Sequence, residues 1–426
     1  MSFFSIYNDY QQLDFEEYFS TVKQTDIAGI LNRDRLQKRD FLNLLSPAAG
    51  EFLEQAAQKA HRLTVQHFGR VMFLYAPLYV SNYCESSCLY CGFKVSNDIK
   101  RKKLSLQEVR REALALKEKG FQHILLLTGC SREKSPVSYI QDCVREVKDL
   151  FSSVSLEVYA LKEEEYADLI ASGVDGLTIY QEVYDPRTYK QVHPQGPKQD
   201  YHFRLDAPER ACRAGIRTVN IGALLGLDDW RQEAFYAGLH AAYLQDKYPE
   251  TAVNISVPRL QPHLGDYRAG HTVGNRELVQ IIVAYRLFLP RVGINLSTRE
   301  GAELRDNLLP LGITKISAES STAVGGYANR HGDNPENQEK QEKQEINIFT
   351  KDDIVLRKIK QKFSGGRGSK EDPYLIENAY QFNQIRFLSD KYFQQIASID
   401  MQEFIEEHGW EPISNSEQGF KGKFEN

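Results

Sequence analysis

Apolar residues follow two alternating patterns between residues 71 and 318. Short runs rich in β-branched and aromatic residues predict strands, and the longer stretches between them carry apolar residues at helical spacing. Two of these stretches, Leu106–Lys119 and Glu163–Ala171, are followed closely by glycines that suit the end of a helix. The eight predicted strands are Met72–Val80, His123–Thr128, Val154–Tyr159, Gly176–Gln181, Arg217–Ala223, Ala252–Val257, Val292–Ser297 and Ile313–Ala318.

Strands that alternate with helices predict a parallel sheet and an α/β fold. Eight such units in about 250 residues match a (β/α)8 barrel of the TIM type. In such barrels the functional groups lie at the carboxyl ends of the strands. We therefore expect the polar and cysteine-containing segments after the first, second, fourth and seventh predicted strands to meet at one rim.

The two ends of the chain depart from this alternation. Before the barrel, apolar residues recur at helical spacing, and Ser46-Pro47 marks the start of a helix. The run from Asn337 to Glu345 is polar and of low complexity, which is typical of a linker. We predict a helical N-terminal extension at 1–70, the barrel at 71–330, a polar linker at 331–364 and a small β-rich appendage at 365–426.

The composition is that of an ordinary globular protein, with 41% hydrophobic and 26% charged residues among 426. The net charge of -5 gives no basic field for nucleic acid. No apolar run reaches the roughly 18 residues that a membrane span needs, and the first residues do not resemble a secretory signal. We therefore expect a cytoplasmic protein with reduced thiols and with no nucleic-acid or membrane partner.

Cys84, Cys88 and Cys91 form a C-x3-C-x2-C pattern directly after the first predicted strand. Thiolates at this spacing can bind three irons of a 4Fe-4S cluster and leave the fourth iron open for chemistry. A structural zinc site usually has paired C-x2-C arms or a nearby H-x3-5-H, and a disulfide framework does not suit six cysteines in 426 residues. The cysteines that we do not expect to bind iron are Cys130, Cys143 and Cys212.

The cysteine spacing, with Phe93 behind it, is similar to the signature of radical S-adenosylmethionine (SAM) enzymes. Further runs in the same order resemble the 2-iminoacetate synthases, which are the tyrosine lyases of thiamine biosynthesis. The likeness extends from residue 1 to about 332, and the C-terminal part resembles a single GLUG-type β-solenoid repeat. The runs are Leu74–Asn82, Tyr180–Tyr184, Gly222–Leu227, Pro258–Leu260, Leu296–Glu300 and Gly325–Ala328.

The resemblance implies a reaction and its partners. SAM would bind the open iron of the cluster and be cleaved to methionine and a 5′-deoxyadenosyl radical. That radical would abstract hydrogen from L-tyrosine, whose Cα–Cβ bond then breaks to give 2-iminoacetate (dehydroglycine) and p-cresol. Thiazole synthase would use the imine, and a flavodoxin- or ferredoxin-type protein would supply the electron.

The resemblance also assigns substrate residues. Arg299 offers a planar fork for the carboxylate of tyrosine, and Ser297 adds a hydroxyl. Gln181 and Glu182 would anchor the region where the radical forms. As simpler alternatives, Arg299 could form an ion pair with a neighbouring glutamate, and Gln181 and Glu182 could cap a loop.

For SAM, the resemblance suggests Arg204 and Arg210 as partners of the carboxylate, Glu157 as a partner of the ribose hydroxyls and Phe93 as a neighbour of adenine. The simpler alternatives are solvated arginines, an ion pair at the edge of the core and ordinary aromatic packing.

Cys130 departs from the resembling enzymes. They usually have Thr-Gly-Glu after the second strand, and the glutamate takes the SAM amino group. Here the run is Thr128-Gly129-Cys130, and a thiol is a weak acceptor. A catalytically impaired paralogue that binds SAM and the cluster therefore stays an alternative, as does a tryptophan lyase. The hydrogenase-maturation tyrosine lyase has further C-terminal cysteines, whereas this chain has none after Cys212.

Overall fold

The computed structural model describes residues 2–260, 267 and 270–328, together with three short strands at 374–376, 392–395 and 423–425. The chain divides into two compact units, Met1–Ile348 and Phe349–Asn426. The predicted boundaries near 330 and 364 fall outside the described residues and stay predictions.

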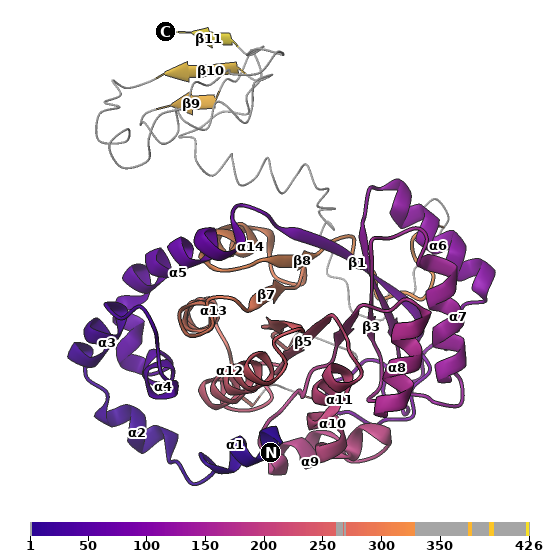
Figure 1. The fold of residues 1–426 in the computed structure, drawn as a ribbon, viewed down its shortest axis with the longest axis horizontal. Coiled ribbons are helices and arrows are strands. Elements are labelled where there is room, and N and C mark those ends of the chain that lie inside the picture. Colours follow the sequence, from indigo (N-terminus) through magenta and orange to yellow (C-terminus); the bar gives the residue numbers. More distant parts are fainter. Residues whose placement is uncertain are drawn as a thin grey trace. The chain divides into compact units, whose positions relative to one another are not determined.

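The first unit is built around a closed parallel barrel whose eight strands follow one another in sequence order (Figure 1). The pairing of Phe73 with Lys315 joins the first strand to the last and closes the barrel. All eight predicted strands are confirmed, although the fourth and eighth are only three residues long. The strands are β1 (Phe73–Ser81), β2 (His123–Thr128), β3 (Ser153–Glu157), β4 (Gly176–Thr178), β5 (Thr218–Gly222), β6 (Ala252–Ser256), β7 (Gly293–Leu296) and β8 (Lys315–Ser317).

Helices surround the barrel and bury their apolar faces on it (Figure 1). The first of them begins with a capping box, in which the Ser105 hydroxyl accepts from the Glu108 amide while the Glu108 carboxylate accepts from the Ser105 amide. These helices are α6 (Leu106–Glu118), α7 (Val137–Val147), α8 (Glu163–Ser172), α9 (Pro186–Val192), η2 (Pro197–Gln199), α10 (Tyr201–Leu205), α11 (Ala207–Arg213), α12 (Trp230–Lys247), α13 (Asn275–Phe288), α14 (Ala302–Leu308) and η3 (Leu309–Leu311).

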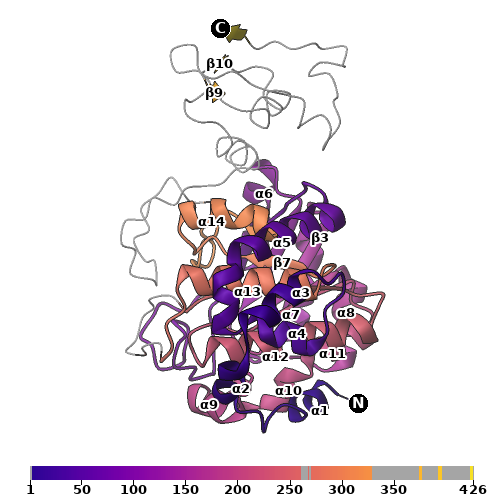
Figure 2. The ribbon, with the colours of Figure 1, turned by 90° about the vertical axis from the view of Figure 1, so that its left-hand side faces the viewer.

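The predicted helical extension is confirmed, and α4 and α5 pack against α13 on the outside of the barrel (Figure 2). Phe41 stacks on Phe288 at a centroid distance of 4.5 Å within this contact. Ser46-Pro47 starts a 3-10 helix, and the α-helix itself begins six residues after Pro47, at Leu53. The helices of the extension are α1 (Phe3–Asn8), α2 (Phe15–Thr21), α3 (Gln24–Leu31), α4 (Lys38–Leu44), η1 (Pro47–Phe52) and α5 (Leu53–Phe68).

The second unit contains a parallel sheet in the order β11-β10-β9. Its strands are β9 (Tyr374–Ile376), β10 (Tyr392–Gln395) and β11 (Lys423–Glu425). These strands agree with the predicted β-rich appendage, while the rest of the predicted solenoid repeat and the linker at 331–364 lie outside the described residues. Among the described helices, none has the length and apolar character needed to cross a membrane.

Candidate active site

A cavity of about 360 Å³ extends from the barrel interior to the loops at the carboxyl ends of the strands. Most of the residues that the sequence predicts for the site line it, as expected for functional groups at the carboxyl ends of barrel strands. The predicted residues that line it are Cys84, Cys88, Cys91, Phe93, Cys130, Glu157, Glu182, Arg204, Ser297 and Arg299. Gln181 and Arg210 are not among the lining residues.

The cysteine loop has little regular secondary structure and is held by hydrogen bonds from its neighbours. The Glu85 amide donates to the Cys130 carbonyl at 2.9 Å, and the Leu89 amide donates to the Val192 carbonyl at 3.0 Å. The Arg101 guanidinium donates to the carbonyls of Asn82 and Phe93 at 2.7 and 2.9 Å. The loop is therefore hydrogen-bonded to the segment after β2, to the end of α9 and to Arg101, which follows it in the chain.

Two glycines allow this loop to approach its neighbours closely. A Cβ on Gly129 would lie 2.3 Å from the Tyr83 carbonyl oxygen. A Cβ on Gly196 would lie 2.5 Å from the Ser86 Cα, and Gly196 also has a φ of +97°. Because no side chain fits at either contact, both positions require glycine.

The thiols differ in their electrostatic surroundings. A hydrogen bond from the Cys130 thiol lowers the pKa of Cys84 to about 6. Burial raises the pKa of Cys91 to about 12 and also raises the pKa of Cys88. Among the described residues, no three metal-ligating side chains lie close enough together to hold a single metal ion. Three thiols that line one cavity without converging fit a cluster, in which each binds a different iron.

Tyr90 also lines the cavity, and the sequence analysis missed it. Its hydroxyl lies 2.7 Å from His193 Nε2, while His193 Nδ1 lies 2.9 Å from the Tyr189 carbonyl. Burial lowers the pKa of His193 to about 2, so the imidazole is neutral, donates from Nδ1 and accepts from Tyr90. Its position between Cys88 and Cys91 was the feature of the sequence that could have identified Tyr90 as a site residue.

A buried group of charges lies beside the cysteines. Lys198 Nζ is 2.5 Å from Glu182 Oε1, and Arg204 Nη2 is 3.5 Å from the same oxygen. The side chains of all three residues are at most 10% exposed. Two cations facing one carboxylate leave a net positive charge, which suits an anionic group of a ligand. Lys198 was not predicted, since η2 lies far from the cysteines in sequence.

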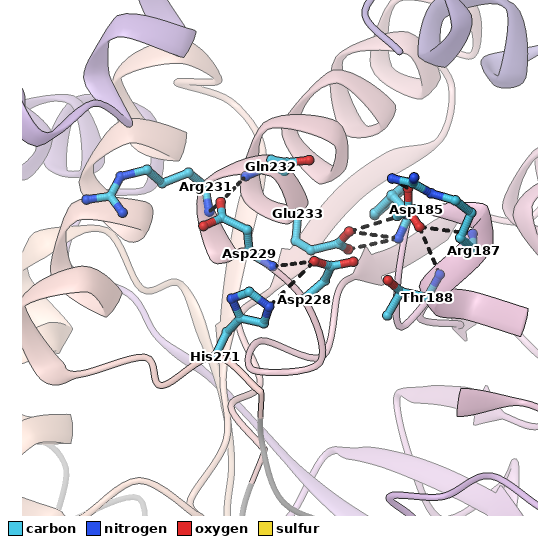
Figure 3. Close-up of polar contacts among 10 residues, drawn as sticks. Asp185, Arg187, Thr188, Asp228, Asp229, Arg231, Gln232, Glu233 and His271 are labelled. Atoms are coloured by element: carbon cyan, nitrogen blue, oxygen red, sulfur yellow. Dashed lines mark hydrogen bonds and ion pairs between the residues drawn. The ribbon is translucent and has the colours of Figure 1, made fainter. Parts of the chain in front are cut away.

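The segment that follows Glu182 is anchored by Glu233 of α12, which Figure 3 shows bonded to the backbone at Asp185. Glu182 has a φ of +72°, an uncommon conformation for a residue with a side chain. The Glu233 carboxylate, which is 1% exposed, accepts from the Tyr184 amide at 2.8 Å and from the Asp185 amide at 3.4 Å. Asp185 in turn caps α9 by accepting from the Thr188 amide at 2.8 Å. These bonds stabilise a turn that the local sequence alone would not favour.

Two predicted residues lie outside the cavity. Gln181 is buried, and neither polar atom of its side chain has a hydrogen-bond partner in the described part of the chain. Arg210 donates to the carbonyls of Leu161 and Phe203 at 2.8 and 2.6 Å and stacks over the Phe203 ring. Arg210 thus joins the segment after β3 to α10, and its position gives no support to the predicted contact with SAM.

The predicted substrate residues also line the cavity. Ser297 Oγ accepts from the Arg299 amide at 3.2 Å, so both residues belong to one turn after β7. Glu300, the next residue, pairs with Arg259 of the segment after β6.

Glu157 stands at the end of β3, and burial together with the negative charge of Glu182 raises its pKa to about 7.

Comparisons with known proteins agree with this geometry. Residues 78–237 match the Radical SAM superfamily, and residues 256–388 match the Biotin and Thiamin Synthesis associated domain. The 2-iminoacetate synthase of Escherichia coli K12 is 42% identical over 326 residues, which cover 76% of this chain and 86% of that enzyme. The 2-iminoacetate synthase of Salmonella typhimurium LT2 is also 42% identical, over 72% of this chain and 81% of that enzyme.

The chain belongs to the 2-iminoacetate synthase family. As a member of this family it is a radical SAM lyase, and the superfamily implies a 4Fe-4S cluster and SAM as cofactors. A solved structure of the FeFe-hydrogenase maturase HydG from Carboxydothermus hydrogenoformans superposes with a TM-score of 0.72 and 30% identity, covering 84% of this chain and 81% of that one. The superposition shows that this chain and HydG share the same fold.

Proposed function

We propose that this chain cleaves the Cα–Cβ bond of L-tyrosine to give 2-iminoacetate and p-cresol. The observation that carries the proposal is that one cavity is lined by the three cysteines, by the buried cations and by the Ser297–Arg299 turn. A radical generated at the cysteines would therefore form in the space where an amino acid is bound. Family membership makes tyrosine the substrate to test first.

On the cofactor side of the cavity, Cys84, Cys88 and Cys91 would hold the cluster. When bound, the cluster and SAM supply a 5′-deoxyadenosyl radical that abstracts hydrogen from the substrate. Arg204 and Lys198 present the positive charge for the SAM carboxylate, and Arg204 is itself fixed by donating to the Tyr180 carbonyl at 2.7 Å.

The remaining cofactor contacts would come from Glu157, which faces the cavity from β3 and could bind the ribose hydroxyls. Phe93 and Tyr90 provide aromatic surface for adenine. Phe93 packs edge-on against Tyr79 at 5.5 Å, which restricts its orientation.

On the substrate side, Arg299 would bind the tyrosine carboxylate through its planar fork, and Ser297 would add a hydrogen bond. The barrel interior offers an apolar and aromatic wall for the phenol ring, formed by Tyr75, Leu125 and Leu127. Enclosure of the reacting atoms protects a radical from solvent and from side reactions.

We further propose which proteins use the product of the reaction and supply its electron. Its imine product would be passed to thiazole synthase for the thiazole ring of thiamine, and a flavodoxin- or ferredoxin-type protein would reduce the cluster. Reduced thiols are needed to hold iron, which fits a reducing compartment such as the cytoplasm.

The test is a comparison of substrates with anaerobically reconstituted protein, SAM and dithionite. Tyrosine and tryptophan are supplied in parallel, and products are identified by mass spectrometry. We expect p-cresol from tyrosine and no cleavage of tryptophan. Side-chain cleavage of tryptophan alone would identify a tryptophan lyase, whereas bound cluster and SAM without cleavage of either would identify the impaired paralogue suggested by Cys130.

A further inference from the structure

Two thiols that line the cavity lie side by side. The Cys130 thiol forms a hydrogen bond to the sulfur of Cys84, and the backbone amide of Cys130 donates to the same sulfur. Both residues are partly exposed, whereas Cys143 and Cys212 are buried. Because Cys84 and Cys130 both line the cavity, a small molecule that enters the cavity can reach the two sulfur atoms.

The backbone holds these two cysteines together. The Glu85 amide, next to Cys84, donates to the Cys130 carbonyl at 2.9 Å, and the Gly129 amide donates to the Ser81 carbonyl at 3.0 Å. A Cβ on Gly129 would lie 3.2 Å from the Cys84 Cβ. The segments after β1 and β2 are therefore joined on either side of the thiols. Such close backbones are what a disulfide requires, since its Cα atoms are usually roughly 4.4–6.8 Å apart.

Cys84 has two uses that exclude each other. As a cluster ligand its sulfur binds iron, and as half of a disulfide it cannot. Peroxide converts an accessible thiol to a sulfenic acid, which a neighbouring thiol turns into a reversible disulfide. Without that neighbour, further oxidation gives a sulfinic acid, which thiol reductants do not reverse. A second cysteine beside a cluster ligand therefore protects that ligand while the cluster is absent, and the glutamate of the resembling enzymes could not do so.

We propose that Cys130 is a resolving cysteine for Cys84, so that hydrogen peroxide converts the cluster-free pair to a Cys84–Cys130 disulfide. Peroxide oxidises one sulfur to a sulfenic acid and is itself reduced to water. The other thiol attacks that sulfur, the S–S bond forms, the S–O bond breaks, and the hydroxyl leaves as water with the thiol proton. In total, two thiols and one peroxide give one disulfide and two waters.

The disulfide keeps iron out of the site until a thiol reductant cleaves it. The proposal goes beyond the proposed function and uses only one part of it, namely that Cys84 is a cluster ligand.

The first test maps the disulfide in the full chain. The cluster is removed anaerobically with a chelator, the protein is treated with a small excess of hydrogen peroxide, and free thiols are alkylated before digestion and mass spectrometry. We expect one linked pair of peptides that contain Cys84 and Cys130, in the parent and in the matched control Cys143→Ala. A disulfide from Cys84 to Cys88 or to Cys91, or no disulfide, would overturn the proposal.

The second test measures recovery. The parent and Cys130→Ser are freed of the cluster, treated with peroxide, reduced with dithiothreitol and reconstituted, and the iron content is compared with that of an untreated sample of the same variant. The parent should recover nearly all of its iron. Cys130→Ser should recover less than about half, with sulfinic acid at Cys84. Equal recovery in both variants would show that Cys130 does not protect Cys84.

Two additions keep the outcomes distinct. Cys130→Ala replaces Cys130→Ser if that variant is insoluble. Neither test depends on turnover, so a protein that forms the disulfide and recovers its iron but makes no p-cresol would contradict the proposed function alone. If Cys84→Ala binds iron as the parent does, the cluster assignment itself is wrong.

Discussion

Cys130 is the residue at which this site departs from the resembling enzymes. It follows β2, lines the cavity and directs its thiol to Cys84. A thiol that donates to a neighbouring sulfur offers little to an ammonium group, since sulfur is a weak acceptor. We propose that the SAM amino group lies at this position, where it would lack the charged acceptor that a glutamate would provide.

Cys130→Glu should tighten SAM binding. A charge-assisted hydrogen bond of about 2 kcal/mol corresponds to roughly thirtyfold in affinity. SAM is titrated against both reconstituted proteins, with Cys212→Ala, a buried cysteine outside the cavity, as the matched control. Equal affinities for the Cys130→Glu variant and the parent would show that position 130 does not contact the amino group.

Iron binding should depend on Cys84, Cys88 and Cys91 and on no other cysteine. Substitution of any one of these three by Ala removes a cluster ligand, so the reconstituted protein should lose its brown chromophore and bind far fewer than about four irons. Variants Cys143→Ala and Cys212→Ala should keep the iron content. Retention of the chromophore by Cys88→Ala, or its loss in both controls, would contradict the assignment.

Glu157 should make stability depend on pH. Its folded-state pKa is raised to about 7, while the ordinary value is 4.5. Between these values the folded state keeps a proton that the unfolded state releases, so the contribution of Glu157 is complete below pH 4.5 and decreases as the pH rises to 7. Glu157→Gln has no titrating group at this position. Its free energy of unfolding should therefore increase, relative to that of the parent, by up to about 3 kcal/mol when the pH is raised from 5 to 8.

The free energies of unfolding of parent and Glu157→Gln are measured anaerobically at pH 5 and pH 8. The control is Glu164→Gln, which changes an exposed glutamate on α8. The same difference between parent and Glu157→Gln at both pH values would show that burial does not perturb this carboxyl.

At the scale of elements, the sequence predicts well what depends on local patterns. Apolar runs predicted all eight strands and the helices around them, because barrel strands are buried on both faces and helices on one. It missed Lys198, Tyr90 and the Arg259–Glu300 pair, whose positions depend on contacts between distant segments. Strand β4 ends at Thr178, although the amides of Ile179 and Gln181 still donate to carbonyls of β5. The turn that follows at Glu182 depends on Glu233 of α12.

The cysteine loop depends on the two glycines that it contacts. Gly129→Ala would place a methyl group against the Tyr83 carbonyl, and Gly196→Ala would place one against Ser86 while also straining a positive φ. Both variants should bind clearly less iron after reconstitution. Gly92→Ala, directly after Cys91, meets no atom within 4 Å and should bind iron normally. Full iron content in both Gly129→Ala and Gly196→Ala would mean that the loop adapts more easily than the packing implies.

At the scale of the whole molecule, the barrel strands and every described residue that lines the cavity belong to the unit Met1–Ile348. The second unit, Phe349–Asn426, has its own small parallel sheet. Among the described residues, those to which we assign a part in the chemistry all belong to the first unit.

A chain that ends at Ile348 should remain soluble, bind the cluster and cleave SAM. Iron content and 5′-deoxyadenosine formation are measured beside the full chain, prepared in the same way. Aggregation of the shortened chain would instead show that the second unit covers apolar surface of the first. Soluble protein without iron would show that it contributes to the site.

The most direct test of the account measures p-cresol and 5′-deoxyadenosine together in one anaerobic reaction with SAM, reductant and tyrosine. We expect the two products to accumulate in parallel, and we expect Arg299→Lys to reduce p-cresol while 5′-deoxyadenosine still forms, because lysine lacks the fork that holds the substrate carboxylate. A fully reconstituted protein that forms 5′-deoxyadenosine without p-cresol, or an Arg299→Lys variant that forms p-cresol as the parent does, would contradict the assignment of this cavity to tyrosine cleavage.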